Sequence, residues 1–147
     1  MSLTGGCQCG AVRYRLVGEP IRSNICHCRM CQKAGGSPFM AFAGAAIKDL
    51  VWTRGRPKTF ASSDFAERGF CADCGTPLTY RAPGYDRISV TVGSLDHPDE
   101  AAPTVQYSLE SKVHWLDSIR HLPAHDFAAE MGPTFHITSH QHPDHDT

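Results

Sequence analysis

The stretch ERGFCADCGTPLTY, residues 67–80, has the pattern of a β-strand, a tight turn with two cysteines and a second β-strand. Cys71 and Cys74 are separated by two residues, a spacing at which both sulfurs can bind one metal ion. Gly75 follows directly, and glycine readily adopts the positive φ angle that turns backbone N–H groups toward the sulfurs. We therefore predict a hairpin with a metal-binding turn at its tip, a unit typical of a mainly β fold.

Five further cysteines are clustered in the same way. The seven cysteines form three groups in the sequence, namely Cys7 with Cys9, Cys26 with Cys28 and Cys31, and Cys71 with Cys74. Because seven is odd, internal disulfides cannot pair all of them, and thiols at these spacings are typical zinc ligands. Each group alone would also fit a redox pair or buried thiols, but three groups in one short chain favour zinc.

The simplest division of the seven thiols gives two zinc sites. The first and last groups supply four thiolates, which close a structural site across the 62 positions from Cys9 to Cys71. The middle group supplies three, which leaves one coordination position for water or a substrate. His27 is the alternative fourth ligand, but the cysteines on either side of it favour a side chain turned away from the metal. We expect His27 to face solvent or to support a ligand.

Composition and charge narrow the classes of function. The chain has 147 residues, 41% of them hydrophobic, which fits a single domain with its own core. Its formal net charge is −1, with both signs mixed along the chain, so we expect no nucleic-acid or membrane partner. No apolar run approaches the length of a membrane-spanning helix, and the first residues lack the pattern of a secretory signal. These features predict a cytoplasmic protein with reduced thiols.

Most of the remaining sequence predicts strands. Alternation over residues 11–16 places the apolar side chains on one face and Arg13 and Arg15 on the other. Residues 50–55 and 58–63 have the pattern of one hairpin around a Gly-Arg-Pro turn. Two further strands are expected within residues 38–44 and 86–92.

Helical signals are few and weak. Short helical turns are expected at residues 29–33 and 115–122. We predict that residues 1–126 form one domain and that residues 127–147 form a tail rich in histidine and proline. The tail histidines have no packing period, which favours a mobile polar segment over a metal site.

Four segments carry a family resemblance. They are GGCQCGAVRY (5–14), CHCRMCQKAGG (26–36), ERGFCADCGTPLTY (67–80) and SVTVGSLDHPDEAAPTVQYSLESKVHWLD (89–117). In this order they resemble the glutathione-dependent formaldehyde-activating family, also called the GFA or centromere protein V-type family, over residues 5 to about 125. The resemblance implies a mainly β fold of coiled antiparallel sheets, the β-tent, clamped by zinc and with few short helices.

The resemblance also implies two zinc sites and an activity. By position, the structural zinc ligands would be Cys7, Cys9, Cys71 and Cys74, and the catalytic zinc ligands would be Cys26, Cys28 and Cys31. The family's founding activity joins glutathione and formaldehyde into S-(hydroxymethyl)glutathione, a carbon–sulfur bond reaction classed with the lyases. The implied partners are a small thiol such as glutathione and a small aldehyde. At position 106 this chain has glutamine, where family members often carry histidine.

Several residues are candidates for roles around the middle site. Zinc with three thiolates carries a net negative charge, so nearby cations would favour a further thiolate. Arg29 and Lys33 flank the middle group, although both also fit a solvated loop. Trp52 and Trp115 are candidates for pocket walls, although large aromatic residues are more often core. Candidate proton carriers, which no pattern places at the zinc, are Asp96, His97, His114 and Asp117.

The residues leave more than one function open. An open three-thiolate zinc would serve an enzyme that handles the adduct of a small thiol and an aldehyde. If His27, a tail histidine or a partner closes the middle site, the chain is a zinc-stabilised binding module without catalysis. Metal-free thiols would instead serve redox sensing. Exposed strand edges in such folds can pair between subunits, so a homodimer is also among the expectations.

Overall fold

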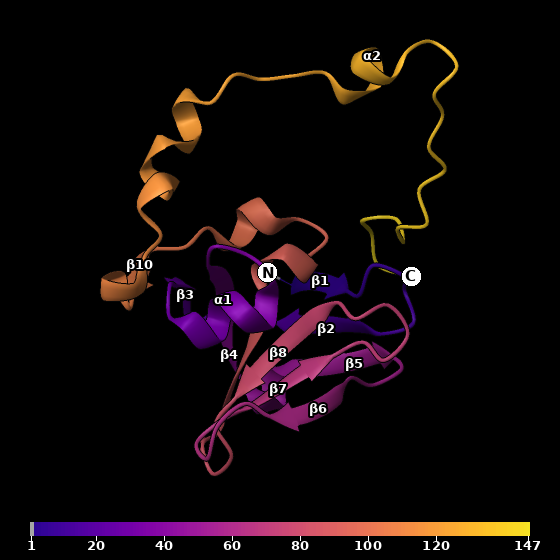
Figure 1. The fold of residues 1–147 in the computed structure, drawn as a ribbon. Coiled ribbons are helices and arrows are strands. Elements are labelled where there is room, and N and C mark those ends of the chain that lie inside the picture. The colour runs from indigo at the N-terminus through magenta and orange to yellow at the C-terminus, as the bar shows by residue number, and fades with distance from the viewer. Residues whose placement is uncertain (1) are drawn as a thin grey trace.

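Two sheets pack against each other in the computed structural model, which describes residues 2–147 (Figure 1). The smaller sheet has the strand order β1-β2-β5, and the larger has the order β10-β3-β4-β9-β8-β7-β6. The strands are β1 (Ser2–Gly6), β2 (Arg13–Val17), β3 (Arg22–Cys26), β4 (Met40–Ala46), β5 (Leu50–Arg54), β6 (Lys58–Ala61), β7 (Glu67–Phe70), β8 (Pro77–Arg81), β9 (Arg87–Thr91) and β10 (Val105–Tyr107). The predicted mainly β class with antiparallel sheets is confirmed.

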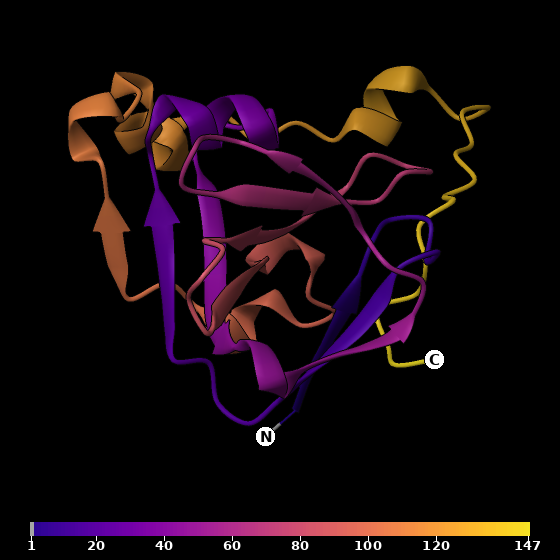
Figure 2. The ribbon, with the colours of Figure 1, turned by 90° about the horizontal axis from the view of Figure 1, so that it is seen from below.

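One strand pair departs from the antiparallel pattern. β10 joins the edge of the larger sheet parallel to β3, while β3 and β4 are antiparallel. Figure 2 shows these three strands side by side, away from the smaller sheet. A late segment of the chain therefore lies next to the strand that ends at Cys26.

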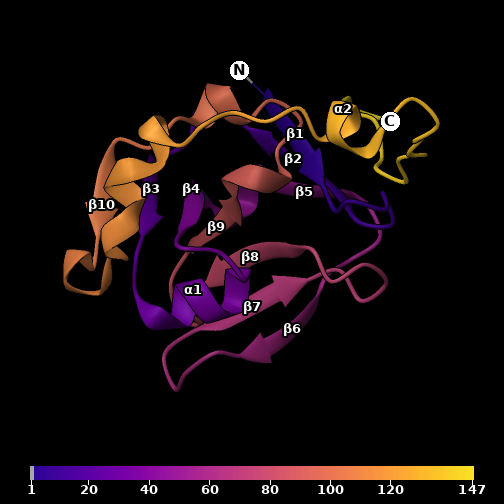
Figure 3. The ribbon, with the colours of Figure 1, turned by 45° about the horizontal axis from the view of Figure 1, so that its top comes forward.

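Helices are few and short, as the sequence predicts. The α-helices are α1 (Arg29–Gly35) and α2 (Phe127–Met131), and the 3₁₀ helices are η1 (Ile47–Asp49), η2 (Val92–Ser94), η3 (Pro98–Ala101), η4 (Leu109–Ser111) and η5 (His114–His121). α1 follows β3 and lies over the larger sheet on the side of β7 and β8 (Figure 3). None of the helices in residues 2–147 is both long enough and apolar enough to cross a membrane.

The larger sheet is packed on both faces. Its inner face shares the main core with the smaller sheet, and this core includes Leu3, Tyr14, Leu16, Ala43, Leu78 and Val90. Its outer face holds a second cluster, in which Cys31, Met40 and Phe42 are buried with Tyr80 packed against them. Because successive residues of a strand point to opposite faces, Ala43 and Phe42 serve the two clusters from one strand. The middle cysteine group belongs to this outer cluster.

The hairpin predicted from residues 67–80 is confirmed. β7 and β8 are antiparallel neighbours, with Gly69 opposite Thr79. Gly75 has a φ angle of 77°, in the region that glycine adopts without a steric cost. Its backbone N–H donates a hydrogen bond to the carbonyl oxygen of Cys71, which closes the turn between the two cysteines.

The hairpin predicted from residues 50–55 and 58–63 is wrong. β5 pairs with β2 in the smaller sheet, whereas β6 pairs with β7 in the larger one. Between them Gly55 has a φ angle of 55°, and a Cβ there would lie 2.2 Å from the carbonyl oxygen of Ala11. The Gly-Arg-Pro segment is therefore a corner that carries the chain from one sheet to the other. Turn residues mark the change of direction but do not select the strand's partner, which long-range burial decides.

The prediction that Arg13 lies on an exposed polar face of β2 is wrong. Arg15 is exposed, but only 2% of Arg13 is exposed. The Arg13 guanidinium donates to both carboxylate oxygens of Asp96, at 2.8 and 2.6 Å, and Thr4 donates to the same carboxylate. The segment after β9 carries Asp96 against β1, so the strand's second face is covered by a later part of the chain.

The substitution Asp96→Asn is expected to destabilise the fold by about 3 kcal/mol, because it leaves the buried charge of Arg13 without a counter-ion. Burial raises the pKa of Asp96, but hydrogen bonds from Arg13 and Thr4 outweigh it and lower the pKa below its ordinary 3.8. The ion pair therefore stabilises fully above that value and loses its contribution as the pH falls through the folded-state pKa.

Urea unfolding at neutral and acid pH measures this difference, with Asp99→Asn as the exposed control. The stability gap between wild type and Asp96→Asn should shrink in acid. Equal stability of Asp96→Asn and Asp99→Asn at neutral pH would contradict the prediction.

The C-terminal segment leaves the sheets and then returns to them, as the yellow end of the chain shows in Figure 1. The backbone N–H of His142 donates to the backbone carbonyl oxygen of Gln8 at 2.7 Å, and the Arg13 guanidinium donates to the carbonyl oxygen of His145 at 2.9 Å. The end of the tail thus lies against the turn that carries Cys7 and Cys9. The domain boundary at residue 126 stays a prediction.

Candidate metal centres and the adjoining cavity

The first and last cysteine groups meet in space as the sequence predicts. The Sγ atoms of Cys7, Cys9, Cys71 and Cys74 all lie within 4.8 Å of one another. The Sγ atom of Cys9 lies 3.5 Å from that of Cys7 and 3.8 Å from that of Cys71. Tetrahedral zinc with Zn–S distances of about 2.3 Å needs sulfurs roughly 3.8 Å apart. The four sulfurs therefore fit the donor set and spacing of a closed zinc site.

Backbone and hydroxyl groups of the two turns surround these sulfurs. The Val12 N–H donates to the Sγ atom of Cys7 at 3.2 Å. Thr76 bridges the turns, since its hydroxyl accepts from the N–H of Gln8 and contacts the Cys74 sulfur at 3.1 Å. Burial raises the pKa of Cys74, but hydrogen bonds from Thr76 and nearby N–H groups outweigh it and lower the pKa to about 6. The surroundings of Cys74 therefore favour the thiolate, the form that binds metal.

The middle group is assembled by the junction of β3 and α1. Cys26 ends β3, Cys28 is the N-cap of α1, and Cys31 lies in its first turn. The Cys28 sulfur accepts a hydrogen bond from the Cys31 N–H at 3.4 Å, the bond that an N-cap side chain accepts at the start of a helix. At the other end, Gly36 adopts the left-handed conformation that terminates many helices. The three Sγ atoms lie within 4.8 Å of one another.

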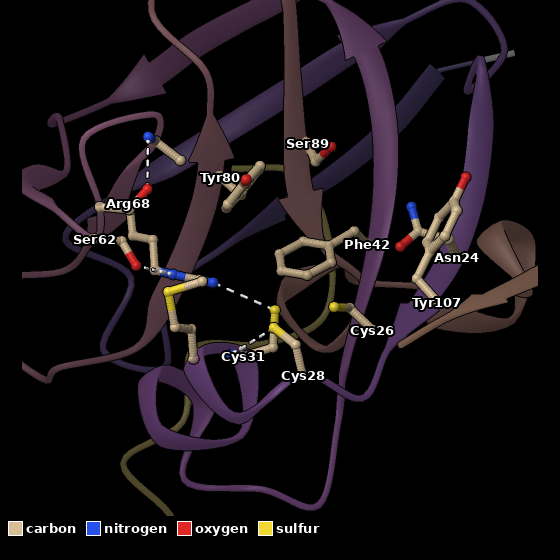
Figure 4. Close-up of a pocket in the computed structure, with 13 residues that line it drawn as sticks. Asn24, Cys26, Cys28, Cys31, Phe42, Ser62, Arg68, Tyr80, Ser89 and Tyr107 are labelled. Atoms are coloured by element: carbon tan, nitrogen blue, oxygen red, sulfur yellow. Dashed lines mark hydrogen bonds between the residues drawn. The ribbon is translucent and has the colours of Figure 1, made fainter. Parts of the chain in front are cut away.

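A buried arginine that sequence reasoning missed contacts the middle group. Arg68 of β7 donates to the Sγ atom of Cys31 at 3.3 Å and to the hydroxyl of Ser62 at 2.9 Å (Figure 4). Its guanidinium also stacks 5.0 Å from the ring centre of Tyr80. The only sequence signal for Arg68 is its place on the strand before the Cys71 turn, 37 positions from Cys31.

The cations suggested by sequence proximity do not reach the sulfurs. Arg29 donates to the side chain of Gln32, and Lys33 is exposed on α1. The positive charge at the middle group comes instead from Arg68. Long-range strand pairing, rather than neighbouring sequence, places this charge.

Cys28 and Cys31 of the middle group have pKa values shifted in opposite directions. Burial raises the pKa of Cys31 to about 12, although Arg68 acts in the opposite direction. Burial also acts to raise the pKa of Cys28, but hydrogen bonds from the Cys31 N–H and from neighbouring thiols lower it overall. A metal ion would hold all three as thiolates, since binding displaces the thiol protons.

A cavity of about 260 Å³ adjoins the middle group. Figure 4 shows the sulfurs at one side, Arg68 and Tyr80 on one wall, and Asn24 and Tyr107 on the opposite wall. The lining residues are Asn24, Cys26, Cys28, Met30, Cys31, Phe42, Ser62, Ser63, Ala66, Arg68, Tyr80, Ser89 and Tyr107. The cavity is large enough for a small organic ligand, and all three cysteines line it.

His27 lies beside the sulfurs but outside their group. Its side chain is 1% exposed, so it supports the structure and does not face solvent. Its Nε2 atom lies 3.0 Å from the amide oxygen of Gln106, and the backbone N–H of His27 donates to the backbone carbonyl oxygen of Tyr107. Gln106, which differs from the histidine of many family members, thus contacts His27. In residues 2–147 no histidine, aspartate or glutamate joins the three sulfurs as a fourth candidate ligand.

Most other candidates lie away from the cavity. Trp52 packs edge-on against Tyr14 in the main core, and Trp115 is exposed on η5. Asp96 is buried with Arg13, and Asp117 pairs with Lys112. His97 and His114 are exposed and do not line the cavity.

Fold and sites together define a small mainly β protein with two thiolate groups suited to zinc, one closed by four cysteines and one with three facing a cavity. The family model described as glutathione-dependent formaldehyde-activating enzyme matches residues 2–111, and the chain belongs to this family.

Known proteins similar to this chain agree with the family. An uncharacterized lyase of Schizosaccharomyces pombe is 40% identical over 76 residues, which are 52% of this chain and 55% of the relative's length. A Halomonas elongata protein named "Putative glutathione-dependent formaldehyde-activating enzyme" is 29% identical over 127 residues, 80% of this chain and 81% of that protein.

A crystal structure of a Rhodobacter sphaeroides protein has a similar fold. It matches with a TM-score of 0.56 and 23% identity, over 70% of this chain and 98% of that one. The similarity extends over most of the chain and supports the architecture described above.

Proposed function

We propose that the protein is a zinc-dependent enzyme of the carbon–sulfur lyase type that acts on the adduct of a small thiol and a small aldehyde. Glutathione and formaldehyde are the proposed substrates, as for an S-(hydroxymethyl)glutathione synthase. The observation that carries the proposal is the group of Cys26, Cys28 and Cys31 beside a cavity of about 260 Å³. The family membership and the names of the two relatives support it.

The two cysteine groups are assigned different roles in this proposal. The four-cysteine group would hold a structural zinc that joins the two turns, and the three-cysteine group would hold the catalytic zinc. Zinc at the three-cysteine group would supply a Lewis acid that binds a substrate sulfur as the thiolate. The side chains around the cavity determine how the substrates are bound and oriented.

Arg68 and Tyr80 are assigned the electrostatic roles. Arg68 balances part of the negative charge of the thiolates and so favours the presence of a further one. Burial raises the pKa of Tyr80, although Arg68 opposes this, so its hydroxyl stays protonated at neutral pH. Tyr80 can therefore donate a hydrogen bond to the oxygen of an aldehyde in the cavity. Phe42 excludes water from the same wall.

The proposed reaction conserves all atoms. The substrate sulfur donates an electron pair to the carbonyl carbon and forms the carbon–sulfur bond. The π pair of the carbonyl moves to its oxygen, which receives the proton that the thiol lost. The product is a hemithioacetal, and its cleavage follows the same steps in reverse. The proposed setting is the cytoplasm, where substrate and ligand thiols stay reduced.

The non-catalytic binding module is the second candidate. It would need a fourth ligand at the middle group, but His27 is buried against Gln106 and Tyr107. The tail end lies near the four-cysteine group instead. These contacts support an open middle site over one closed from within the chain.

The test combines a measurement of zinc content with an assay of the proposed reaction. Elemental analysis should give two zinc ions per chain, and NMR exchange spectroscopy should show faster formation and breakdown of S-(hydroxymethyl)glutathione than buffer alone. Two zinc ions with no acceleration would sink the enzyme proposal for this pair of substrates. Little bound zinc with reversible oxidation of the middle thiols would favour redox sensing.

The substitution Arg68→Gln is expected to weaken zinc binding at the middle group about tenfold, because it removes a charge-assisted hydrogen bond from a negatively charged site. Competition with a zinc chelator measures this affinity. Arg68→Lys keeps the charge and should recover part of the loss, and the second zinc at the four-cysteine group should be unaffected. Equal zinc affinity in wild type and Arg68→Gln would contradict the assigned role.

A further inference from the structure

The strand register places two arginines, four strands apart, in one row across the outer face of the larger sheet. Residues opposite each other in paired strands point to the same face. The row runs Arg22, Gly44, Ser89, Tyr80, Arg68, over strands β3, β4, β9, β8 and β7. Arg68 is bound to Cys31 and Ser62, so the opposite end of the row holds the second cation.

Arg22 shares a face of β3 with the middle cysteine group. Arg22, Asn24 and Cys26 are alternate residues of the strand, so their side chains point to the same side. The four steps along the strand from Cys26 to Arg22 span about 13 Å. Asn24 and Cys26 both line the cavity. The cavity therefore extends along β3 from the sulfurs as far as Asn24, and Arg22 lies beyond its lining at the next position on the same face.

The contacts of Arg22 leave most of its guanidinium free. It donates to the hydroxyl of Tyr107 at 3.1 Å, and Tyr107 lines the cavity. Arg22 is exposed and makes no ion pair with any residue in the described part of the chain. No acidic side chain among residues 2–147 lines the cavity. An anion at this end would meet an unneutralised arginine.

Gly44 leaves the sheet surface between Arg22 and Ser89 without a side chain. It lies opposite both Arg22 and Ser89 in the register. A Cβ at this position would lie 3.2 Å from the carbonyl oxygen of Arg22 and 3.8 Å from the Ser89 hydroxyl. The missing side chain leaves the sheet surface beside Arg22 open.

We propose that Arg22, held by Tyr107 and accompanied by Asn24, is an anion subsite that binds a carboxylate of the thiol substrate. This inference rests on the proposed function, because it takes the middle cysteine group as the place where the substrate sulfur binds. The guanidinium forms paired hydrogen bonds with a carboxylate, and the Asn24 amide supplies a further donor.

The subsite selects thiols by the distance between sulfur and charge. A thiol without a carboxylate gains nothing from Arg22. Cysteine itself carries its carboxylate too close to its sulfur to reach along β3. Glutathione has a full peptide unit between its sulfur and its glycine carboxylate, so it is the class of ligand that can contact both ends.

The test measures binding rather than turnover. Isothermal titration of the zinc-loaded protein compares glutathione with its glycine monoethyl ester, in which that carboxylate is neutral. Wild type should bind glutathione about tenfold more tightly than the ester, the gain expected from one charge-assisted pair. Arg22→Gln should remove this preference, and Tyr107→Phe should reduce it by loosening Arg22.

Lys48→Gln is the matched control, because it removes one positive charge from an exposed residue of η1 outside the cavity. It should retain the preference. Equal binding of glutathione and its ester, no binding of either, or an unchanged preference in Arg22→Gln would overturn the subsite. Binding with the predicted preference but without accelerated adduct formation would overturn the proposed reaction and keep the subsite, so the two failures are distinct.

Discussion

Replacing Cys71 with serine should lower the melting temperature by roughly 10 °C, from a loss of about 4 kcal/mol. The variant leaves the four-cysteine group with three sulfurs, at the position that joins the N-terminal turn to the β7–β8 hairpin. Zinc bound only by the folded chain contributes its binding free energy to folding, so a weaker site is a less stable fold. Cys71 is also 1% exposed, and a buried serine hydroxyl adds a desolvation cost.

Calorimetry and zinc analysis of the same samples test this prediction. Ala72→Ser is the matched control, since it introduces the same side chain at an exposed position of the same turn. The control should melt within a degree or two of wild type and keep two zinc ions per chain. An unchanged melting temperature in Cys71→Ser would contradict the structural role of the four-cysteine group.

Replacing Cys28 with serine is expected to affect zinc binding and activity far more than stability, the reverse of Cys71→Ser. If the proposed function holds, zinc at the middle group and at least 100-fold of the adduct-forming activity should be lost, while the melting temperature should change by only a few degrees. Cys28 contributes its sulfur as N-cap of α1, and serine is itself a favourable N-cap residue. The substitution therefore removes a metal ligand and keeps the start of the helix.

The variant Cys28→Ala separates these two contributions. It removes both the ligand and the cap, so it should cost about 1 kcal/mol more than Cys28→Ser in urea unfolding. Zinc content, NMR exchange and melting temperature can be measured on wild type, Cys28→Ser and Cys28→Ala. If Cys28→Ser and Cys71→Ser lost the same stability, the division into a catalytic and a structural group would be wrong.

The sequence predicts the parts of the site that depend on local spacing. Cys71 and Cys74 converge because two residues separate them and Gly75 closes the turn. Cys26 and Cys28 converge with Cys31 because a strand end and a helix start fix them. The meeting of the first and last groups followed from the number of ligands that zinc needs.

Long-range pairing decides what the sequence could not predict. Arg68 reaches Cys31 only through the order of strands in the larger sheet, so proximity in sequence favoured Arg29 instead. Alternation assigned Arg13 to a polar face, but a later loop covers that face with Asp96. A local sequence pattern predicts which side chains share a face of a strand. It does not predict which later segment of the chain will cover that face.

The small size of β10 determines which part of the cavity wall opens most easily. β10 has three residues at the edge of the larger sheet, and among residues 2–147 it pairs only with β3. Its further ties are single contacts, such as that of Gln106 with His27. Proteins open locally at free energies far below global unfolding where few contacts hold a segment. The wall that carries Tyr107 is therefore expected to open as a local fluctuation while both cysteine groups stay assembled, and exchange of the proposed substrate would then not require unfolding of the domain.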